Sequence, residues 1–147
     1  MKLLSIFLTL FFIEGSPLWG SDFDKARADA ANNNKFIVIN FSGSDWCGPC
    51  IKLKRDVLDS PEFLSFAEKN LMLVRADFPR LKKNQLDKKQ TALNEALAEK
   101  YNQEGKFPFT VLVGADGKML KEWEGYPAGI TPASFMQEIQ TIINARK

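Results

Sequence analysis

The sequence predicts one α/β domain in which a mixed β-sheet lies between helices. Three observations support this fold class. The 147 residues suffice for one well-packed domain but leave little room for two. Short runs of β-branched and aromatic residues alternate with longer segments of helical periodicity. The last two of these runs are separated only by a short turn, which indicates an antiparallel hairpin within the sheet.

The elements of the first half follow from local patterns. Residues 23–33 are spaced to bury one helical face and run into three asparagines, whose side chains compete for the helix backbone. The run FIVINF at 36–41 is typical of a strand covered on both faces. Residues 51–55 have the composition of a helix. Another helix begins at Ser60, which is followed by proline and glutamate as expected at a helix N-terminus.

The second half continues the alternation. Residues 71–74 predict a second buried strand, and residues 88–101 predict a helix with Leu93, Leu97 and Tyr101 on its inner face. The remaining elements are a hairpin of residues 109–113 and 119–123 around the turn 115–118, and a last helix that begins at Thr131-Pro132 and buries Phe135, Ile139, Ile142 and Ile143. The predicted order is helix, strand, helix, helix, strand, helix, strand, strand, helix.

Composition excludes several classes of chemistry. The chain has no histidine and two cysteines, so a Ser-His-Asp or Cys-His catalytic site and a tetrahedral structural zinc site cannot be assembled from it. The formal net charge is +2, with acids and bases well mixed, so we expect neither nucleic acid nor an anionic membrane as the main partner. What remains for the two thiols is mostly redox chemistry.

The N-terminus has the pattern of a secretory signal. Lys2 precedes an apolar stretch at 3–13, which is too short to span a membrane, and small and turn-forming residues follow at 14–20. We therefore expect residues 1–20 to be a cleavable signal peptide, with cleavage near Gly20 or Ser21, and residues 21–147 to be one exported, soluble domain. An uncleaved amphipathic anchor or a buried N-terminal helix is the alternative reading of the same stretch.

The two cysteines carry the chemistry. Cys47 and Cys50 stand three residues apart between a buried strand and a predicted helix, where helix amides and the helix dipole favour a thiolate on Cys47 and lower its pKa. Cys50, one turn further, can attack a mixed disulfide that Cys47 forms with a substrate. Gly48 permits a tight turn, and Pro49 is tolerated at a helix start. The alternatives are half of an intermolecular metal site or a structural staple.

The motif Trp46-Cys47-Gly48-Pro49-Cys50 after a buried strand resembles the active site of the thioredoxin family. The hairpin, a glycine after it and the last amphipathic helix follow the order of that family, so the resemblance covers nearly all of residues 21–147. It implies a thioredoxin-like fold and a cis peptide bond between Phe107 and Pro108. It further implies that Pro108 shapes the groove against the disulfide and keeps metal ions from the thiols. The backbone of Phe107 would pair with an extended substrate, and Trp46 would form the rim of the groove.

Several positions depart from the thioredoxin pattern. Asn40 stands where thioredoxin carries a buried aspartate, and an amide cannot accept a proton. Asp45 is a candidate base only if its side chain turns inward, and a solvated loop acid is the favoured reading. Arg75 occupies the place of a lysine near that buried acid, and we expect it to be a surface charge.

One segment is longer than the family minimum. The chain between Asp77 and the helix that leads to Tyr101 is rich in lysine and arginine, particularly from Arg80 to Lys89. It could bind an acidic partner, but a solvated helix start is the commoner meaning of such a run. Trp123 in the hairpin is expected to pack against the sheet.

These observations together predict an exported, monomeric thiol–disulfide oxidoreductase without a cofactor or metal. The Gly-Pro dipeptide resembles reducing members of the family, for which the reduction potential is about −270 mV. We therefore expect a reductant of disulfide-containing proteins in the periplasm or outside the cell, with a transmembrane thiol carrier as its implied electron donor. The alternatives are a disulfide-forming oxidant, and a thioredoxin-fold binding or chaperone module whose thiols are incidental.

Overall fold

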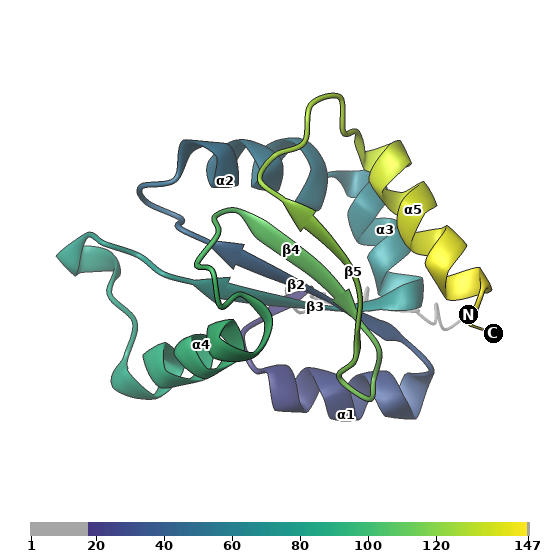
Figure 1. The fold of residues 1–147 in the computed structure, drawn as a ribbon, viewed down its shortest axis with the longest axis horizontal. Helices are drawn as coiled ribbons and strands as arrows, with labels where there is room; N and C mark the ends of the chain where they lie inside the picture. Colours follow the sequence, from purple (N-terminus) through teal and green to yellow (C-terminus); the bar gives the residue numbers. More distant parts are fainter. Residues whose placement is uncertain (1–17, 147) are drawn as a thin grey trace, which may run out of the picture.

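The computed structural model describes residues 18–146 as a five-stranded sheet with helices on both faces (Figure 1). The strands lie in the order β1-β3-β2-β4-β5. Their bounds are Trp19–Gly20 for β1, Phe36–Ser42 for β2, Leu71–Asp77 for β3, Phe109–Val113 for β4 and Met119–Glu124 for β5. The α-helices are α1 (Phe23–Asn33), α2 (Gly48–Leu53), α3 (Pro61–Asn70), α4 (Lys88–Tyr101) and α5 (Pro132–Asn144). The mixed sheet confirms the predicted fold class, and the order of elements is the predicted one except for β1, which was not predicted.

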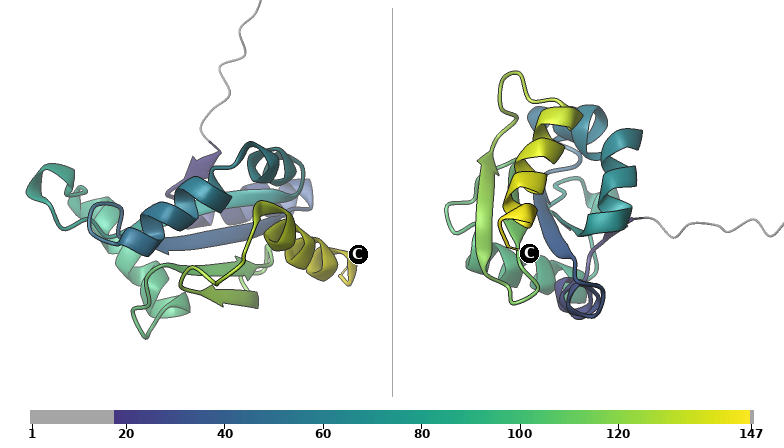
Figure 2. Two further views of the ribbon diagram at one scale, coloured as in Figure 1. Left: turned by 90° about the horizontal axis from the view of Figure 1, so that it is seen from above. Right: turned by 90° about the vertical axis from the view of Figure 1, so that its right-hand side faces the viewer.

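The sheet has two covered faces because alternate residues of its central strands point to opposite sides. Val38 faces α2, α3 and α5, while Ile37, Ile39 and Phe41 face α1 and α4. Figures 1 and 2 show the same layers, with α2, α3 and α5 on one face and α1 and α4 on the other. The central strand β2 is paired on both sides, which explains its continuous apolar run.

Most predicted boundaries agree with the structure, and a few differ. β3 extends to Asp77, and α2 continues directly into a π-helical turn, η1, at Lys54–Leu58. The prediction that Leu93 faces the interior was wrong: its side chain is exposed, and Asn94 occupies the buried face of α4 with Leu97 and Tyr101. An amide can be buried there because Asn94 donates to the backbone oxygen of Asp77 and accepts from Gln90.

The expected signal peptide lies almost entirely outside the described residues. Of residues 1–20, the structure describes Leu18, Trp19 and Gly20, and the last two form β1, which pairs in parallel with β3. No helix within residues 18–146 is long and apolar enough to cross a membrane.

The register of the sheet brings three connections to one edge. β2 and β3 are parallel, with Ser42 opposite Asp77, so the segments that follow them leave the sheet side by side. β4 is antiparallel to β2 and pairs Phe109 with Phe41, so the loop that precedes β4 reaches the same edge. The fold thus gathers the cysteine motif, the basic segment and Pro108 at one end.

Candidate active site

Cys47 and Cys50 form a disulfide at the start of α2, with an S–S distance of 2.11 Å. Cys47 is the N-cap residue of the helix, and Pro49 occupies one of its first positions, where its missing N–H costs no helical hydrogen bond. Both cysteines are buried, with 5% of Cys47 and 3% of Cys50 exposed, whereas Gly48 and Pro49 between them are exposed. A substrate would therefore meet the disulfide past the Gly-Pro turn.

Each of the two sulfur atoms accepts a hydrogen bond from one backbone amide. The amide of Cys50 donates to Sγ of Cys47 over 3.3 Å, and the amide of Gly43 donates to Sγ of Cys50 over 3.5 Å. Donors at a helix start stabilise negative charge on the sulfur that accepts from them. This arrangement suits Cys47 as the thiolate that forms when the pair is reduced.

The expected cis peptide bond between Phe107 and Pro108 is present. The loop before it is held by Asn102, whose side chain accepts from the amide and donates to the carbonyl of Lys106. The Lys106 ammonium lies between two carboxylates, Glu104 at 2.8 Å and Glu124 at 3.0 Å, and these ion pairs raise its pKa. Pro108 is thereby fixed at the sheet edge that also carries the disulfide.

Three aromatic rings from different segments form a cluster beside the motif. Phe107 contacts Trp46 with ring centroids 5.5 Å apart and Phe78 with centroids 5.4 Å apart. The indole Nε1 of Trp46 also donates to the backbone oxygen of Phe78 over 2.8 Å. Gly43 permits this arrangement, because a Cβ at residue 43 would lie 2.2 Å from the Trp46 ring. The predicted rim residue Trp46 is therefore linked to both neighbouring loops.

The carboxylate of Asp45 does not face the cysteines. It accepts hydrogen bonds from the amides of Arg80 and Leu81, at 2.9 and 3.0 Å, and from the side chain of Asn84. These hydrogen bonds, led by the one from Arg80, lower the pKa of the Asp45 carboxyl. Asp45 is thus not an inward-facing base, because its carboxylate lies at the surface, where it anchors the segment that follows β3.

The segment after β3 is anchored at further points and projects from the domain. Asp77 accepts from the amide and hydroxyl of Ser44, and the Arg80 guanidinium stacks on the Trp46 ring at 3.7 Å from its centroid. Residues 78–87 contain one short 3₁₀ turn, η2 (Lys82–Asn84), and α4 begins only at Lys88. The favoured interpretation of the basic run as a helix start is therefore wrong for residues 80–87. Figures 1 and 2 place this segment at the same end as the start of α2.

Asn40 is buried on the sheet face that α2 covers, as its match to a buried acid predicts. It is 2% exposed, and its Nδ2 donates to Oγ1 of Thr110 on β4. Within residues 18–146, neither cysteine sulfur is hydrogen-bonded to a carboxylate. If the pair is reduced, no carboxylate in this part of the chain is hydrogen-bonded to Cys50 Sγ to accept its proton.

The expectation that Arg75 is a surface charge was wrong. Its side chain is 17% exposed, stacks on Trp19 at 4.3 Å and lies 3.6 Å from a carboxylate oxygen of Asp59. Burial lowers the pKa of the guanidinium, partly offset by the Asp59 charge. Trp19 of β1 covers part of the cation and limits its contact with water. The spacing of the two residues in the sequence does not predict this contact.

Trp123 packs as predicted. It is buried, its ring contacts Phe135 of α5 at 4.7 Å between centroids, and its Nε1 donates to Glu138. It therefore supports the sheet on the face that carries α5.

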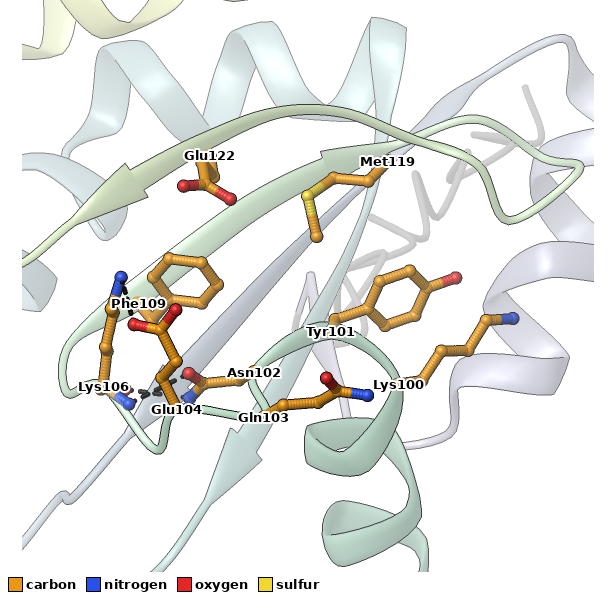
Figure 3. A pocket seen from close by; sticks show the side chains of 9 residues that line it. All are labelled: Lys100, Tyr101, Asn102, Gln103, Glu104, Lys106, Phe109, Met119 and Glu122. Carbon is orange, nitrogen blue, oxygen red and sulfur yellow. Dashed lines mark hydrogen bonds and ion pairs between the residues drawn. The ribbon is translucent and has the colours of Figure 1, made fainter.

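Several hollows of the surface lie away from the disulfide. One of about 280 Å³ lies between the end of α4 and the hairpin, with Lys106 and Phe109 on its wall and Glu122 across from them (Figure 3). No group of three or more potential metal-ligating side chains occurs within residues 18–146.

Sequence reasoning missed three features of this site. Phe78 completes the aromatic cluster, Asp45 anchors the segment after β3, and Ile51 is an exposed apolar side chain one residue after Cys50. The exposure of Ile51 follows from helical spacing, since Cys50 and Leu53 face inward. Phe78 and Asp45 gave no local signal, because their partners lie more than 25 residues away in the chain.

Comparisons with known proteins agree with the fold and the cysteine pair. The thioredoxin-like family matches residues 18–115. The disulfide bond reductase DsbH of Chlamydia pneumoniae is 32% identical over 134 residues, covering 91% of this chain and 78% of that protein. The thioredoxin-related protein DsbJ of the same organism is 33% identical over 63 residues, covering 43% of this chain and 18% of that protein.

Solved structures of other proteins have the same fold. A DsbH oxidoreductase superimposes with a TM-score of 0.75 at 32% identity, covering 86% of this chain and 83% of that one. A thioredoxin from Thermus thermophilus superimposes with a TM-score of 0.61 at 18% identity, covering 84% of this chain and 85% of that one. The second likeness concerns the fold alone.

Proposed function

Because the chain belongs to the thioredoxin-like family, we propose that it is an exported reductant of protein disulfides that works through Cys47 and Cys50. The chain is homologous to thiol–disulfide oxidoreductases and carries a pair of cysteines with Cys-X-X-Cys spacing. The observation that carries the reducing direction is the likeness to a relative named as a disulfide bond reductase, which extends over 91% of this chain. The Gly-Pro dipeptide between the cysteines supports the same direction.

The proposed reaction is dithiol–disulfide exchange. The Cys47 thiolate attacks one sulfur of a substrate disulfide, forming a mixed disulfide and releasing the other substrate sulfur as a thiolate, which takes up a proton. Cys50 then loses its proton and attacks Sγ of Cys47, which releases the second substrate sulfur. Two electrons pass to the substrate, and the chain is left with the Cys47–Cys50 disulfide. A thiol donor, which we propose is a membrane thiol carrier, must reduce it again.

The groove beside the disulfide would hold the substrate. The backbone of Phe107 pairs with an extended substrate strand, Pro108 shapes the groove, and Trp46, Gly48 and Pro49 line its rim. The exposed Gly-Pro turn and the aromatic cluster at the same sheet edge support these roles. We also propose a monomer.

Two measurements test the direction and the roles of the cysteines. We expect a reduction potential near that of thioredoxin, about −270 mV, against a thiol redox buffer, and a value near −120 mV would make the protein an oxidant. Cys50→Ser should accumulate a mixed disulfide with substrate, and Cys47→Ser should accumulate none and abolish disulfide reduction. Equal trapping by both variants would contradict the assignment. Undiminished substrate binding and cellular function in Cys47→Ser would favour the binding module.

Export through residues 1–20 remains part of the proposal. Cleavage after Gly20 would remove β1, whereas cleavage before Trp19 would keep that strand and the cover over Arg75. The mass of the mature protein recovered from an expressing cell decides between these positions. Retention of all 147 residues would contradict the cleavable signal.

A further inference from the structure

The segment from Arg80 to Lys89 concentrates the positive charge of the chain. It holds five cations and one acid, for a net charge of +4, whereas the whole chain carries +2 and the remaining residues therefore sum to −2. The acid, Asp87, is engaged as the N-cap of α4. The five cations are Arg80, Lys82, Lys83, Lys88 and Lys89, and we call this segment the basic arm.

The cations of the basic arm are available to a partner. None of the five forms an ion pair within residues 18–146, whereas cations elsewhere, such as Lys25, Lys54 and Lys106, pair with carboxylates. All five are exposed, as is Leu81 between them. Unpaired charges of one sign, gathered on one segment, raise the local concentration of oppositely charged ligands and speed their association.

The basic arm is held beside the disulfide. Asp45, two residues before Cys47, accepts from the amides of Arg80 and Leu81, and Trp46, next to Cys47, carries the Arg80 guanidinium on its ring. The anchor is thus formed by Asp45 and Trp46, the two residues directly before Cys47. Residues that flank a substrate disulfide at Cys47 would therefore lie closest to the charge of Arg80, which stacks on the neighbouring Trp46.

Resting on the proposed function, we propose that the basic arm is a docking surface that selects disulfide-containing polypeptides with acidic residues beside the reactive cysteine. Arg80 meets a carboxylate close to the disulfide, and Lys82 and Lys83 on η2 meet carboxylates further along the same segment. The substrate strand is oriented by the Phe107 backbone, and the basic arm adds charge recognition at its side.

The test uses two peptides that share one disulfide and differ only in having glutamates or lysines around it. The purified protein should reduce the acidic peptide with a kcat/KM about tenfold higher at low ionic strength. At about 1 M salt, where the screening length is near 3 Å, the ratio should fall below about twofold. Lys82→Glu/Lys83→Glu should lower the ratio to one or invert it.

A matched variant separates the local effect from net charge. Lys69→Glu/Lys118→Glu makes the same change in charge at exposed lysines near the opposite end of the sheet, beside the start of β3 and the hairpin turn. It should keep the tenfold preference. Equal loss in this variant, or equal rates for both peptides in the wild type, would overturn the docking surface.

Two other outcomes are distinct. If the wild type reduces neither peptide, the proposed reductase function fails, and the basic arm selects no substrate through it. If instead both peptides are reduced equally while vesicles containing anionic phospholipid bind the wild type and not Lys82→Glu/Lys83→Glu, the arm is a membrane contact and the proposal is wrong.

Discussion

The two connections that follow β2 and β3 lie side by side but are built in different ways. The first, residues 43–47, leads into a helix whose start is set by Cys47 as N-cap and by Pro49, all within seven residues. The second, residues 78–87, has one 3₁₀ turn and is held chiefly by side chains of the first, above all Asp45.

This difference separates the part of the molecule proposed to react, the cysteine pair, from the part proposed to recognise substrates, the basic arm. The cysteines are positioned by local capping and by the strand beneath them, so we expect the proposed thiol chemistry to survive changes in the neighbouring loop. The basic arm depends on partners more than 30 residues away in the chain, so a single change in the cysteine connection can release it. The predictions for Asn40→Asp and Gly43→Ala concern the strand beneath the cysteine connection and the connection itself. The later predictions concern the link between the two connections.

The largest effect is expected from Asn40→Asp, beneath the cysteine connection. A carboxylate at a position that is 2% exposed should lower the free energy of unfolding at pH 7 by about 2 kcal/mol. Burial would raise the pKa of this carboxyl, so the loss should be full above the folded-state pKa and should vanish as pH falls below the unfolded value near 4. Denaturant unfolding of the variant and the wild type at pH 7 and below about pH 4 measures this loss of stability.

The same variant tests proton transfer. A carboxylate on the face that α2 covers supplies an acceptor for the proton of Cys50, so the mixed disulfide with substrate should have a shorter lifetime. The matched control is Asn94→Asp, which places a carboxylate at an equally buried position on the opposite face of the sheet. It should cost comparable stability and leave that lifetime unchanged. Equal lifetimes in all three proteins would refute a role for residue 40.

The sequence predicted features that depend on neighbouring residues and missed features that depend on residues distant in the chain. The helix starts at Ser60 and Thr131 were predictable because their caps and prolines are adjacent in the chain. The site was predictable at Cys47, Cys50 and Pro108, where the motif and the order of elements carry the resemblance. Each of these signals comes either from residues adjacent in the sequence or from the order of helices and strands along the chain.

The wrong interpretations concern side chains with distant partners. Arg75 is half-buried because Trp19 lies on it, and Asp45 accepts its hydrogen bonds because the segment after β3 returns to it. Leu93 was placed inside by spacing alone, but Asn94 takes that position because the oxygen of Asp77 accepts its amide. Periodicity counts apolar residues and cannot anticipate a hydrogen bond that makes a polar residue suitable for burial.

The next effect in size is expected from Gly43→Ala. The added Cβ would lie 2.2 Å from the Trp46 ring, so the ring must move and its hydrogen bond to Phe78 must break. We expect a loss of about 1–2 kcal/mol in the free energy of unfolding, measured by denaturant titration. Gly48→Ala is the matched control, since its Cβ would meet nothing within 4 Å. A loss as large in that control would show that the Trp46 contact is not the cause.

A smaller and local effect is expected from Asp45→Ala. Removing the carboxylate takes away the acceptor for the amides of Arg80 and Leu81. These amides should exchange with solvent at least about tenfold faster, while amides of β2 should exchange at the wild-type rate. The preference for acidic peptides should fall with the release of the basic arm. Unchanged exchange at both amides would mean that the arm is held by other contacts.

Acid should release the basic arm in the wild type. The pKa of Asp45 is lowered below 3.8 in the folded protein, so its contribution is fully present above the unfolded value and is lost as pH falls through the folded pKa. The fluorescence of Trp46, followed between pH 5 and about pH 2, should change in this window. Asp45→Asn should show no such transition, and a transition of equal size in that variant would assign it to another group.

The smallest effect is expected from Arg80→Gln, which removes one cation but keeps the backbone amide that Asp45 binds. The contact of the guanidinium with the Trp46 ring should contribute only about 0.5–1 kcal/mol, because the arginine is exposed. Amide exchange at Leu81 should therefore change by less than about fivefold, whereas Asp45→Ala exceeds that limit. Arg80→Lys keeps the positive charge but loses the planar stack on Trp46. If this variant has the wild-type preference for acidic peptides but not the wild-type Trp46 fluorescence, the charge of residue 80 is what recognises the substrate. If amide exchange at Leu81 is as fast in Arg80→Gln as in Asp45→Ala, then the two connections are joined by the stack on Trp46 and not by the Asp45 carboxylate.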